Sequence, residues 1–254
     1  MNPLNSLLTD AIEAKLSDAS VRKALSPDAF VPWAEGLGSE PSPVIPMDLL
    51  SLGGSGGLDG LTEAEIASLA RHEAAAFLSA FIRFEQILNQ FLSRKVREAT
   101  PSKPAPNYLL HVIEEEARHS RMFAQLIDVL GVGYYPRKGV VGLLEYASTF
   151  LVLRWTPLFY MGMLSVESIT DDVLNRVEQG TKSKLFAQVC RLHRIEEARH
   201  MEFASRELER RAAECGALGR WVLSVIAPLL ASAIWEFLTP PEVYTRARVA
   251  EGRR

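Results

Sequence analysis

The sequence contains the same five-residue motif twice, and its residue types are those of a metal site. Each copy of this motif is called a word. Glu-Glu-Ala-Arg-His occupies residues 115–119 and again residues 196–200, an offset of 81 residues. In each copy the second Glu and the His are three positions apart, so on a helix they are separated by roughly 60° and project from one face. Each copy therefore predicts a chelating pair, Glu116 with His119 and Glu197 with His200.

Two further glutamates are expected to complete such a site. In four-helix carboxylate proteins that bind two metal ions, each of the other two helices contributes one Glu. Glu85 and Glu167 are the candidates because they are 82 residues apart, which keeps the offset of the words within one residue. Both stand in apolar stripes, where an uncompensated carboxylate is unfavourable. Two other glutamates, Glu73 and Glu145, are rejected as ligands because the same offset does not pair them with a suitable Glu. The offset pairs Glu73 with Arg154, and it pairs Glu145 with a position at the start of the first long helix.

His193 is a seventh candidate ligand. It precedes Glu197 by four residues, about 40° away on the same helix face, and the first copy of the word has no His at the corresponding position. The site is therefore expected to be asymmetric, with four carboxylates and three imidazoles. Four carboxylates balance the charge of two divalent cations. The alternatives are a structural ion pair for Glu85 and Glu167, and a hydrogen-bonded interior His for His193.

The elements that would position these residues are helices. Thr62 and Glu65 form a candidate capping box, and Gly131 is expected to end a helix. Residues 27–60 are rich in Pro and Gly, which predicts a loop throughout that wraps the body of the protein. The polar tail 242–254 is expected to be mobile. The expected helices are 4–25, 62–100, 104–130, about 140–178 (bent or divided near Pro157), 182–215 and 217–238.

These elements predict an all-α protein, a four-helix bundle with additional N- and C-terminal helices. Residues 1–254 are interpreted as one domain: residues 1–60 a helix and a wrapping loop, residues 62–215 the metal-binding core, and residues 217–238 an extra helix. Two apolar stretches, 140–166 and 221–238, are interrupted by charged residues and Pro. They are expected to be buried helices of the bundle and not membrane spans.

Composition and charge exclude several classes of partner. The chain is 48% hydrophobic and 23% charged with a formal net charge of −3, which argues against a nucleic acid or an anionic membrane as the main partner. Cys190 and Cys215 are too few for a disulfide framework, and the N-terminus has no basic region followed by an apolar run. A reducing, cytoplasmic location is therefore expected.

The two words, with Glu85, Glu167 and the additional His193, resemble the ferritin-like di-iron oxygenases, and most closely the p-aminobenzoate N-oxygenase family. The resemblance covers residues 62–215 and implies a ferritin-like bundle. It implies that the metal ligands are Glu85, Glu116, His119, Glu167, His193, Glu197 and His200. Glu115, Arg118, Glu196 and Arg199 match the neighbours of the ligands, which hold the ligand His rings and balance charge.

The resemblance also implies a reaction. Members of this family use two iron ions and O₂ to oxidise the amino group of an arylamine toward hydroxylamine and nitro products, and they tend to be homodimers. An external electron donor is then required. Manganese is the alternative to iron, since an oxygen-rich ligand set with imidazole suits both. Three other functions remain open: a di-iron hydroxylase or desaturase acting on C–H bonds, a ferroxidase or iron-storage protein, and a metal-free helical scaffold.

Overall fold

The computed structural model describes residues 3–38, 42–54, 56–99, 104–136 and 154–248. Within these ranges every regular element is helical, which confirms the all-α prediction. The α-helices are α1 (Pro3–Arg22), α2 (Pro27–Phe30), α3 (Glu63–Glu98), α4 (Pro104–Leu130), α6 (Thr156–Gly180), α7 (Lys184–Glu214), α8 (Ala217–Leu238) and α9 (Glu242–Ala247). In the described part of the chain, no helix is both long and apolar enough to cross a membrane.

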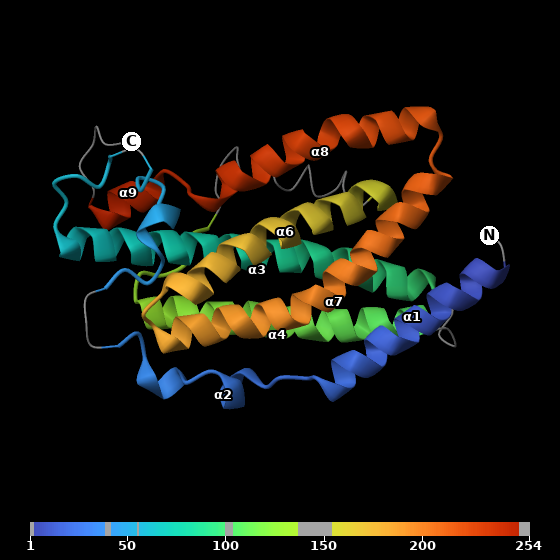
Figure 1. Cartoon of the computed structure of the whole chain (residues 1–254), viewed down its shortest axis with the longest axis horizontal. Helices are drawn as coiled ribbons and strands as arrows, with labels where there is room; N and C mark the ends of the chain where they lie inside the picture. Colours follow the sequence, from blue (N-terminus) through green and yellow to red (C-terminus); the bar gives the residue numbers. More distant parts are fainter. Residues whose placement is uncertain (1–2, 39–41, 55, 100–103, 137–153, 249–254) are drawn as a thin grey trace.

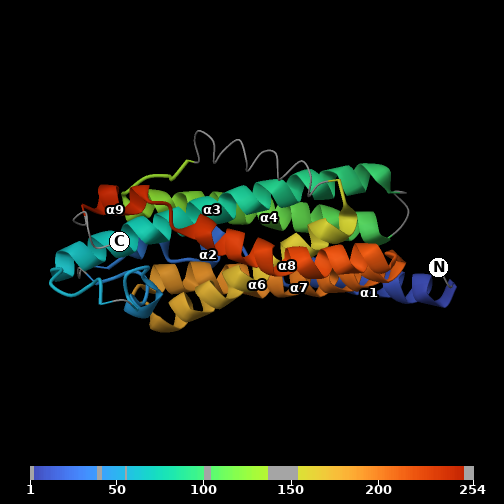
Figure 2. The same ribbon diagram turned by 90° about the horizontal axis from the view of Figure 1, so that it is seen from above.

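The long helices α3, α4, α6 and α7 form the core of the bundle (Figure 1). Helix α3 packs along α4, and α6 packs along α7, so the chain forms two helical hairpins. Figure 2 shows the α3/α4 pair in one layer and the α6/α7 pair in the other. Contacts of α4 with α7 and of α3 with α6 join the layers. The two copies of the word, on α4 and α7, therefore lie on neighbouring helices at the centre of the molecule.

The ends of α3 and α4 follow from local chemistry. The Thr62 hydroxyl accepts from the Glu65 backbone N–H at 3.3 Å, and the Glu65 carboxylate accepts from the Thr62 N–H at 2.8 Å. This is the predicted capping box, which satisfies two of the free N–H groups at the start of α3. Helix α4 ends before Gly131, whose φ of +70° lies in the left-handed region that favours glycine.

Helix α6 begins where a bend was expected. Pro157 occupies the first turn of the helix, after Trp155. A first-turn Pro loses no hydrogen bond, because the first N–H groups of a helix have no partner within it. Pro157 therefore lies at the start of α6, and the expected bend or division near it stays a prediction. The part of the expected helix before residue 154 lies outside the described residues.

The expectation of a loop throughout residues 27–60 is wrong in detail. The segment contains α2 and two short 3₁₀ turns, η1 (Trp33–Glu35) and η2 (Met47–Leu49). Several of its apolar side chains are buried in the main core, among them Val31, Ile45 and Leu52. The Pro and Gly residues that predict turns are compatible with these short helical turns, since a first-turn Pro favours a helix start.

The helix expected at residues 217–238 is confirmed as α8, but the expectation that residues 221–238 are buried in the bundle is wrong. Helix α8 lies on the outside of the bundle against α6 (Figure 1). Leu218, Trp221 and Leu229 are 74%, 62% and 66% exposed, whereas Leu223 and Ile234 are buried. Hydrophobicity alone does not decide burial, because a folded protein keeps much apolar surface in contact with water.

The expectation of a mobile tail is also wrong for its first part. Residues 242–247 form α9, which packs on α3 with Val243 and Ala247 buried. The Arg246 guanidinium lies 3.9 Å from the centre of the Tyr135 ring, and it donates hydrogen bonds to the carbonyls of Val132 and Tyr134. Helix α9 thus fastens the connection that follows α4. The final residues, 249–254, lie outside the described residues.

Candidate metal centre

The structure brings all seven predicted ligands together inside the bundle. Glu85 comes from α3, Glu116 and His119 from α4, Glu167 from α6, and His193, Glu197 and His200 from α7. None of the seven is more than 6% exposed. Their carboxylate oxygens and ring nitrogens form three overlapping groups, and in each group the atoms lie within 4.8 Å of one another.

The two glutamates of the words occupy the middle of this cluster. Glu116 is 3.5 Å from His119 Nδ1 through one oxygen and 2.9 Å from His200 Nδ1 through the other. Glu197 is 3.1 Å from His119 Nδ1 and 3.0 Å from His200 Nδ1, again through different oxygens. Both carboxylates therefore face both rings, which is the arrangement that two carboxylates need to bridge a pair of cations.

The remaining three residues lie around this pair. His193 Nε2 is 3.6 Å from a Glu85 oxygen and 3.5 Å from a Glu197 oxygen. Glu85 groups with His119 and His193, and Glu167 groups with His193 and Glu197. Glu85 and Glu167 are only 4% and 6% exposed, so neither is a solvated surface charge.

On the far side of each His ring, the first Glu of one word accepts hydrogen bonds from the His and Arg of the other word. The Glu196 carboxylate accepts from His119 Nε2 at 2.8 Å and from Arg118 at 2.7 Å. In the same way, Glu115 accepts from His200 Nε2 at 2.7 Å and from Arg199 at 2.7 Å. A carboxylate only accepts hydrogen bonds, so it holds a proton on Nε2 and turns Nδ1 toward the centre of the site.

Unpartnered atoms at the centre show that the residues fit a metal pair. The buried side-chain atoms without a hydrogen-bond partner in the described chain include both oxygens of Glu116, one oxygen each of Glu85 and Glu197, and Nδ1 of His119. Buried polar atoms are almost always bonded, so such a cluster needs another species. The four Glu of the cluster together with Glu115 and Glu196 carry a charge of −6, and Arg118 with Arg199 carry +2. The remaining charge of −4 is one that two divalent cations would neutralise.

The pKa values of the clustered residues reflect the same excess of buried negative charge. Burial, together with the neighbouring Glu116, raises the pKa of Glu85 well above its usual value, and burial with Glu197 does the same to Glu167. Burial lowers the pKa of His193 to about 3, so its ring is neutral. Burial by itself lowers the pKa of His119, but the facing Glu116 carboxylate and the hydrogen bond to Glu196 outweigh it and raise that pKa. Without cations, the site must hold protons instead.

Comparison with known proteins places the chain in a family. Residues 9–254 match the family described as P-aminobenzoate N-oxygenase AurF. The chain belongs to this family. It is also 25% identical over 243 residues to the uncharacterized proteins Mb0909 of Mycobacterium bovis and Rv0885 of Mycobacterium tuberculosis, covering 91% of this chain and 70% of each relative. No solved structure matches the chain.

Membership of the AurF family agrees with the geometry of the site. The family and the buried Glu/His groups together support a di-iron oxygenase with a helical bundle. The resemblance that the two words indicated is thereby confirmed for almost the whole chain. The matching relatives carry no functional description, so the reaction of this member of the family is argued from its own residues.

The rejected rival Glu73 has a different task. It is fully buried on α3 and accepts hydrogen bonds from the Ser51 hydroxyl and, at 2.9 Å, from the Ser51 backbone N–H. It lies 12 residues before Glu85, about 18 Å along the helix axis. Glu73 therefore ties the segment before α3 to the bundle and is not part of the metal centre. The other rival, Glu145, lies outside the described residues.

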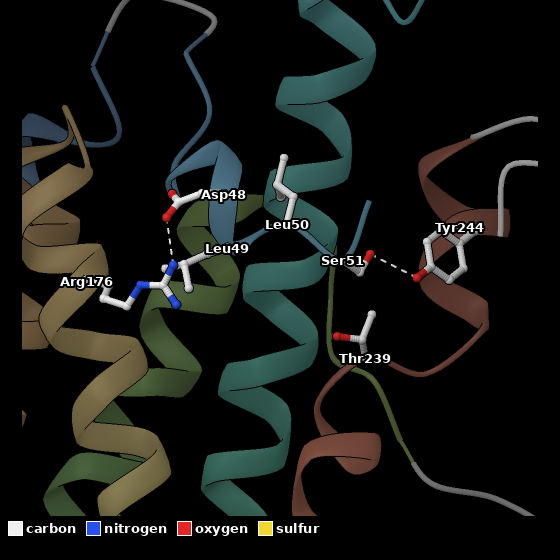
Figure 3. A pocket seen from close by; sticks show the side chains of 7 residues that line it. All are labelled: Asp48, Leu49, Leu50, Ser51, Arg176, Thr239 and Tyr244. Atoms are coloured by element: carbon white, nitrogen blue, oxygen red, sulfur yellow. Dashed lines mark hydrogen bonds and ion pairs between the residues drawn. The ribbon is translucent and has the colours of Figure 1, made fainter. Parts of the chain in front are cut away.

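Ser51 also borders a polar pocket of about 340 Å³ at this end of the bundle (Figure 3). Its hydroxyl accepts from Tyr244 at 2.9 Å, and across the pocket Arg176 bonds Asp48 at 2.6 Å. These contacts join η2 to α6 and α9. The pocket is a feature of the docked N- and C-terminal segments, separate from the metal centre.

Two residues beside the centre escaped sequence reasoning. Ser120 donates a hydrogen bond of 2.6 Å to Glu85, and it directly follows the first word, whereas Met201 follows the second. Tyr108 is fully buried, and its hydroxyl has no hydrogen-bond partner within the described residues. No spacing rule marks either residue, because each depends on which helices meet in space.

Proposed function

We propose that this protein is an O₂-dependent N-oxygenase that uses two iron ions to oxidise the amino group of an aromatic amine toward hydroxylamine and nitro products. One observation carries the proposal: seven buried Glu and His residues converge with unpartnered atoms, in a chain of the AurF family. Iron suits this set, since carboxylate oxygens with imidazole nitrogens favour iron or manganese over softer metals.

The iron pair, when bound, supplies the electrons and the Lewis acidity for the reduction of O₂. The seven converging residues would hold it, and Glu116 and Glu197 are the two carboxylates that face both the His119 and the His200 ring. Glu115 and Glu196 keep the proton of each ligand ring on Nε2, so that Nδ1 presents its lone pair. These residues are committed to binding and orientation, which leaves the substrate to be recognised by other side chains.

An apolar aromatic shell adjoins the centre. The Phe123 ring lies 5.0 Å from the His193 ring, and the Phe81 ring lies 5.9 Å from that of Phe123. Farther along α3, Phe91 stacks on Phe159 with ring centres 3.4 Å apart. These four side chains are at most 3% exposed, so they exclude water from the reacting atoms.

The test combines metal content with turnover. Glu116→Ala and Glu197→Ala are each expected to lose metal and activity together, because each removes a carboxylate that faces both rings. Glu114→Ala is the matched control, since its side chain is 73% exposed on the same helix. Elemental analysis and O₂ consumption with a panel of arylamines are the measurements. Two metal ions per chain in both variants would contradict the assignment.

The products separate this function from its rivals. Mass spectrometry should show oxygen added to the amino nitrogen of an arylamine. Oxidation of a C–H bond instead would indicate a hydroxylase or desaturase, and a large cage in light scattering would indicate iron storage. Anomalous X-ray scattering identifies the metal as iron or manganese. The external electron donor, the homodimer and the cytoplasmic location are parts of the same proposal, and light scattering also tests the dimer.

A further inference from the structure

The metal centre has two similar halves, one around His119 and one around His200. In each half a Glu and an Arg lie behind the His ring, and the two halves differ in the contacts of that Arg. On one side, Arg118 and His119 bind Glu196, and on the other, Arg199 and His200 bind Glu115, with nearly equal distances of 2.7–2.8 Å. The repeat in the sequence accounts for this likeness. Besides the additional His193 and the bond from Ser120 to Glu85, the two halves differ in what holds the two arginines.

Arg199 is held by the N-terminal helix. Its Nε donates a hydrogen bond of 3.2 Å to the hydroxyl of Ser20, which is 4% exposed on α1. A further bond of 3.4 Å runs from its NH1 to the carbonyl of Ile195. With NH2 on Glu115, all three nitrogens of this guanidinium are bonded, and the plane of the group is fixed.

Arg118 has no such support in the described part of the chain. Its Nε is buried without a hydrogen-bond partner. Besides Glu196, its charged neighbour is Glu114 at 3.9 Å, whose side chain is 73% exposed. Helix α1 packs on both α4 and α7, but the hydroxyl of Ser20 reaches only the arginine of the second word.

We propose that Ser20 is a positioning residue that acts on the metal centre through Arg199, Glu115 and His200. The inference rests on the proposed function, since it concerns the same centre. Ser20 fixes the guanidinium, the guanidinium fixes the Glu115 carboxylate, and the carboxylate orients the ring of His200. Helix α1 thereby adds a second difference between the two metal positions, beside the additional His193, although the two words that build them are identical. A helix outside the four-helix core then tunes one of the two ions.

Helix α1 supplies its own matched control. Ser17, one turn before Ser20, is also buried and accepts a hydrogen bond from Asn107 of α4. Ser17→Ala and Ser20→Ala each remove one buried hydroxyl contact that docks α1. Only Ser20→Ala interrupts the series of bonds that leads to His200. Ser20→Thr keeps the hydroxyl and serves as the conservative variant.

The experiment measures iron release. Wild type and the three variants are loaded with Fe(II) without O₂ and mixed with a strong chelator, and the release of the two ions is followed by absorbance. Ser20→Ala should accelerate one of the two release phases about tenfold, the lower end of the effect of losing an outer partner. Ser17→Ala and Ser20→Thr should release both ions as wild type does. Thermal unfolding of the metal-free proteins checks that the two Ala variants lose similar stability.

The outcomes distinguish this inference from the proposed function. Equal acceleration by Ser17→Ala and Ser20→Ala would show that α1 acts only by docking, and this would overturn the inference. Unchanged release in Ser20→Ala would overturn it as well. Wild type that binds fewer than two ions would instead refute the proposed function itself.

Discussion

Replacing Glu196 with Gln changes a single heavy atom behind the proposed metal ligand His119. Its carboxylate is fully buried and accepts two charge-assisted hydrogen bonds, at 2.8 Å from His119 Nε2 and at 2.7 Å from Arg118. Gln has nearly the same shape but offers one acceptor oxygen and one donor NH₂ group. The substitution therefore leaves the packing unchanged and reverses one hydrogen bond.

The size of the effect follows from these contacts. If the amide oxygen accepts from Arg118, the amide NH₂ group faces Nε2 of His119. Nε2 must then accept a hydrogen bond, so the ring proton moves to Nδ1, the nitrogen that would bind the metal. If the amide is turned over, two donors meet at Arg118. Either way one charge-assisted bond is lost, which costs about 2 kcal/mol, or about 30-fold in the affinity of one metal ion.

Competition with a chelator under anaerobic conditions measures this affinity. Glu196→Gln and its counterpart Glu115→Gln should each weaken one of the two ions by a similar factor, since the two contacts have nearly equal lengths. Glu114→Gln, on the exposed side of α4, should bind like wild type. Wild-type affinity in Glu196→Gln would refute the reasoning that this carboxylate sets the ring orientation.

Three further predictions concern stability. Burial raises the pKa of Glu73 from 4.5 to about 6, so between these pH values the folded protein keeps a proton that the unfolded chain releases, and stability falls by about 2 kcal/mol as pH rises. Glu73→Gln should remove this fall in urea unfolding, and parallel pH curves for both proteins would contradict it. Val243→Ala should cost about 2 kcal/mol, because Val243 of α9 is fully buried where that helix packs on α3, whereas Val225→Ala on the exposed face of α8 should cost little; equal midpoints would refute the docking of α9. Thr62→Ala should cost about 1 kcal/mol in thermal unfolding through loss of the cap, and an unchanged midpoint would show that the capping box contributes nothing.

Local sequence signals succeeded where neighbours along the chain decide the structure. The capping box of Thr62 and Glu65 and the left-handed Gly131 depend on a few adjacent residues. The same signals misled where a distant partner decides. The first part of the polar tail forms helix α9, because Val243 and Ala247 are buried where this helix packs on α3.

The sequence by itself determined which residues converge. The repeated word fixes the spacing of Glu116 with His119 and of Glu197 with His200, and helical periodicity with the common offset selects Glu85 and Glu167. These are consequences of the regular geometry of a helix. Only the tertiary structure decided the contacts between helices: the exchange of Glu115 and Glu196 between the words, the bond from Ser120 to Glu85, and the reach of Ser20 to Arg199. Such contacts depend on how helices pack and rotate against one another, and no spacing within one helix encodes that.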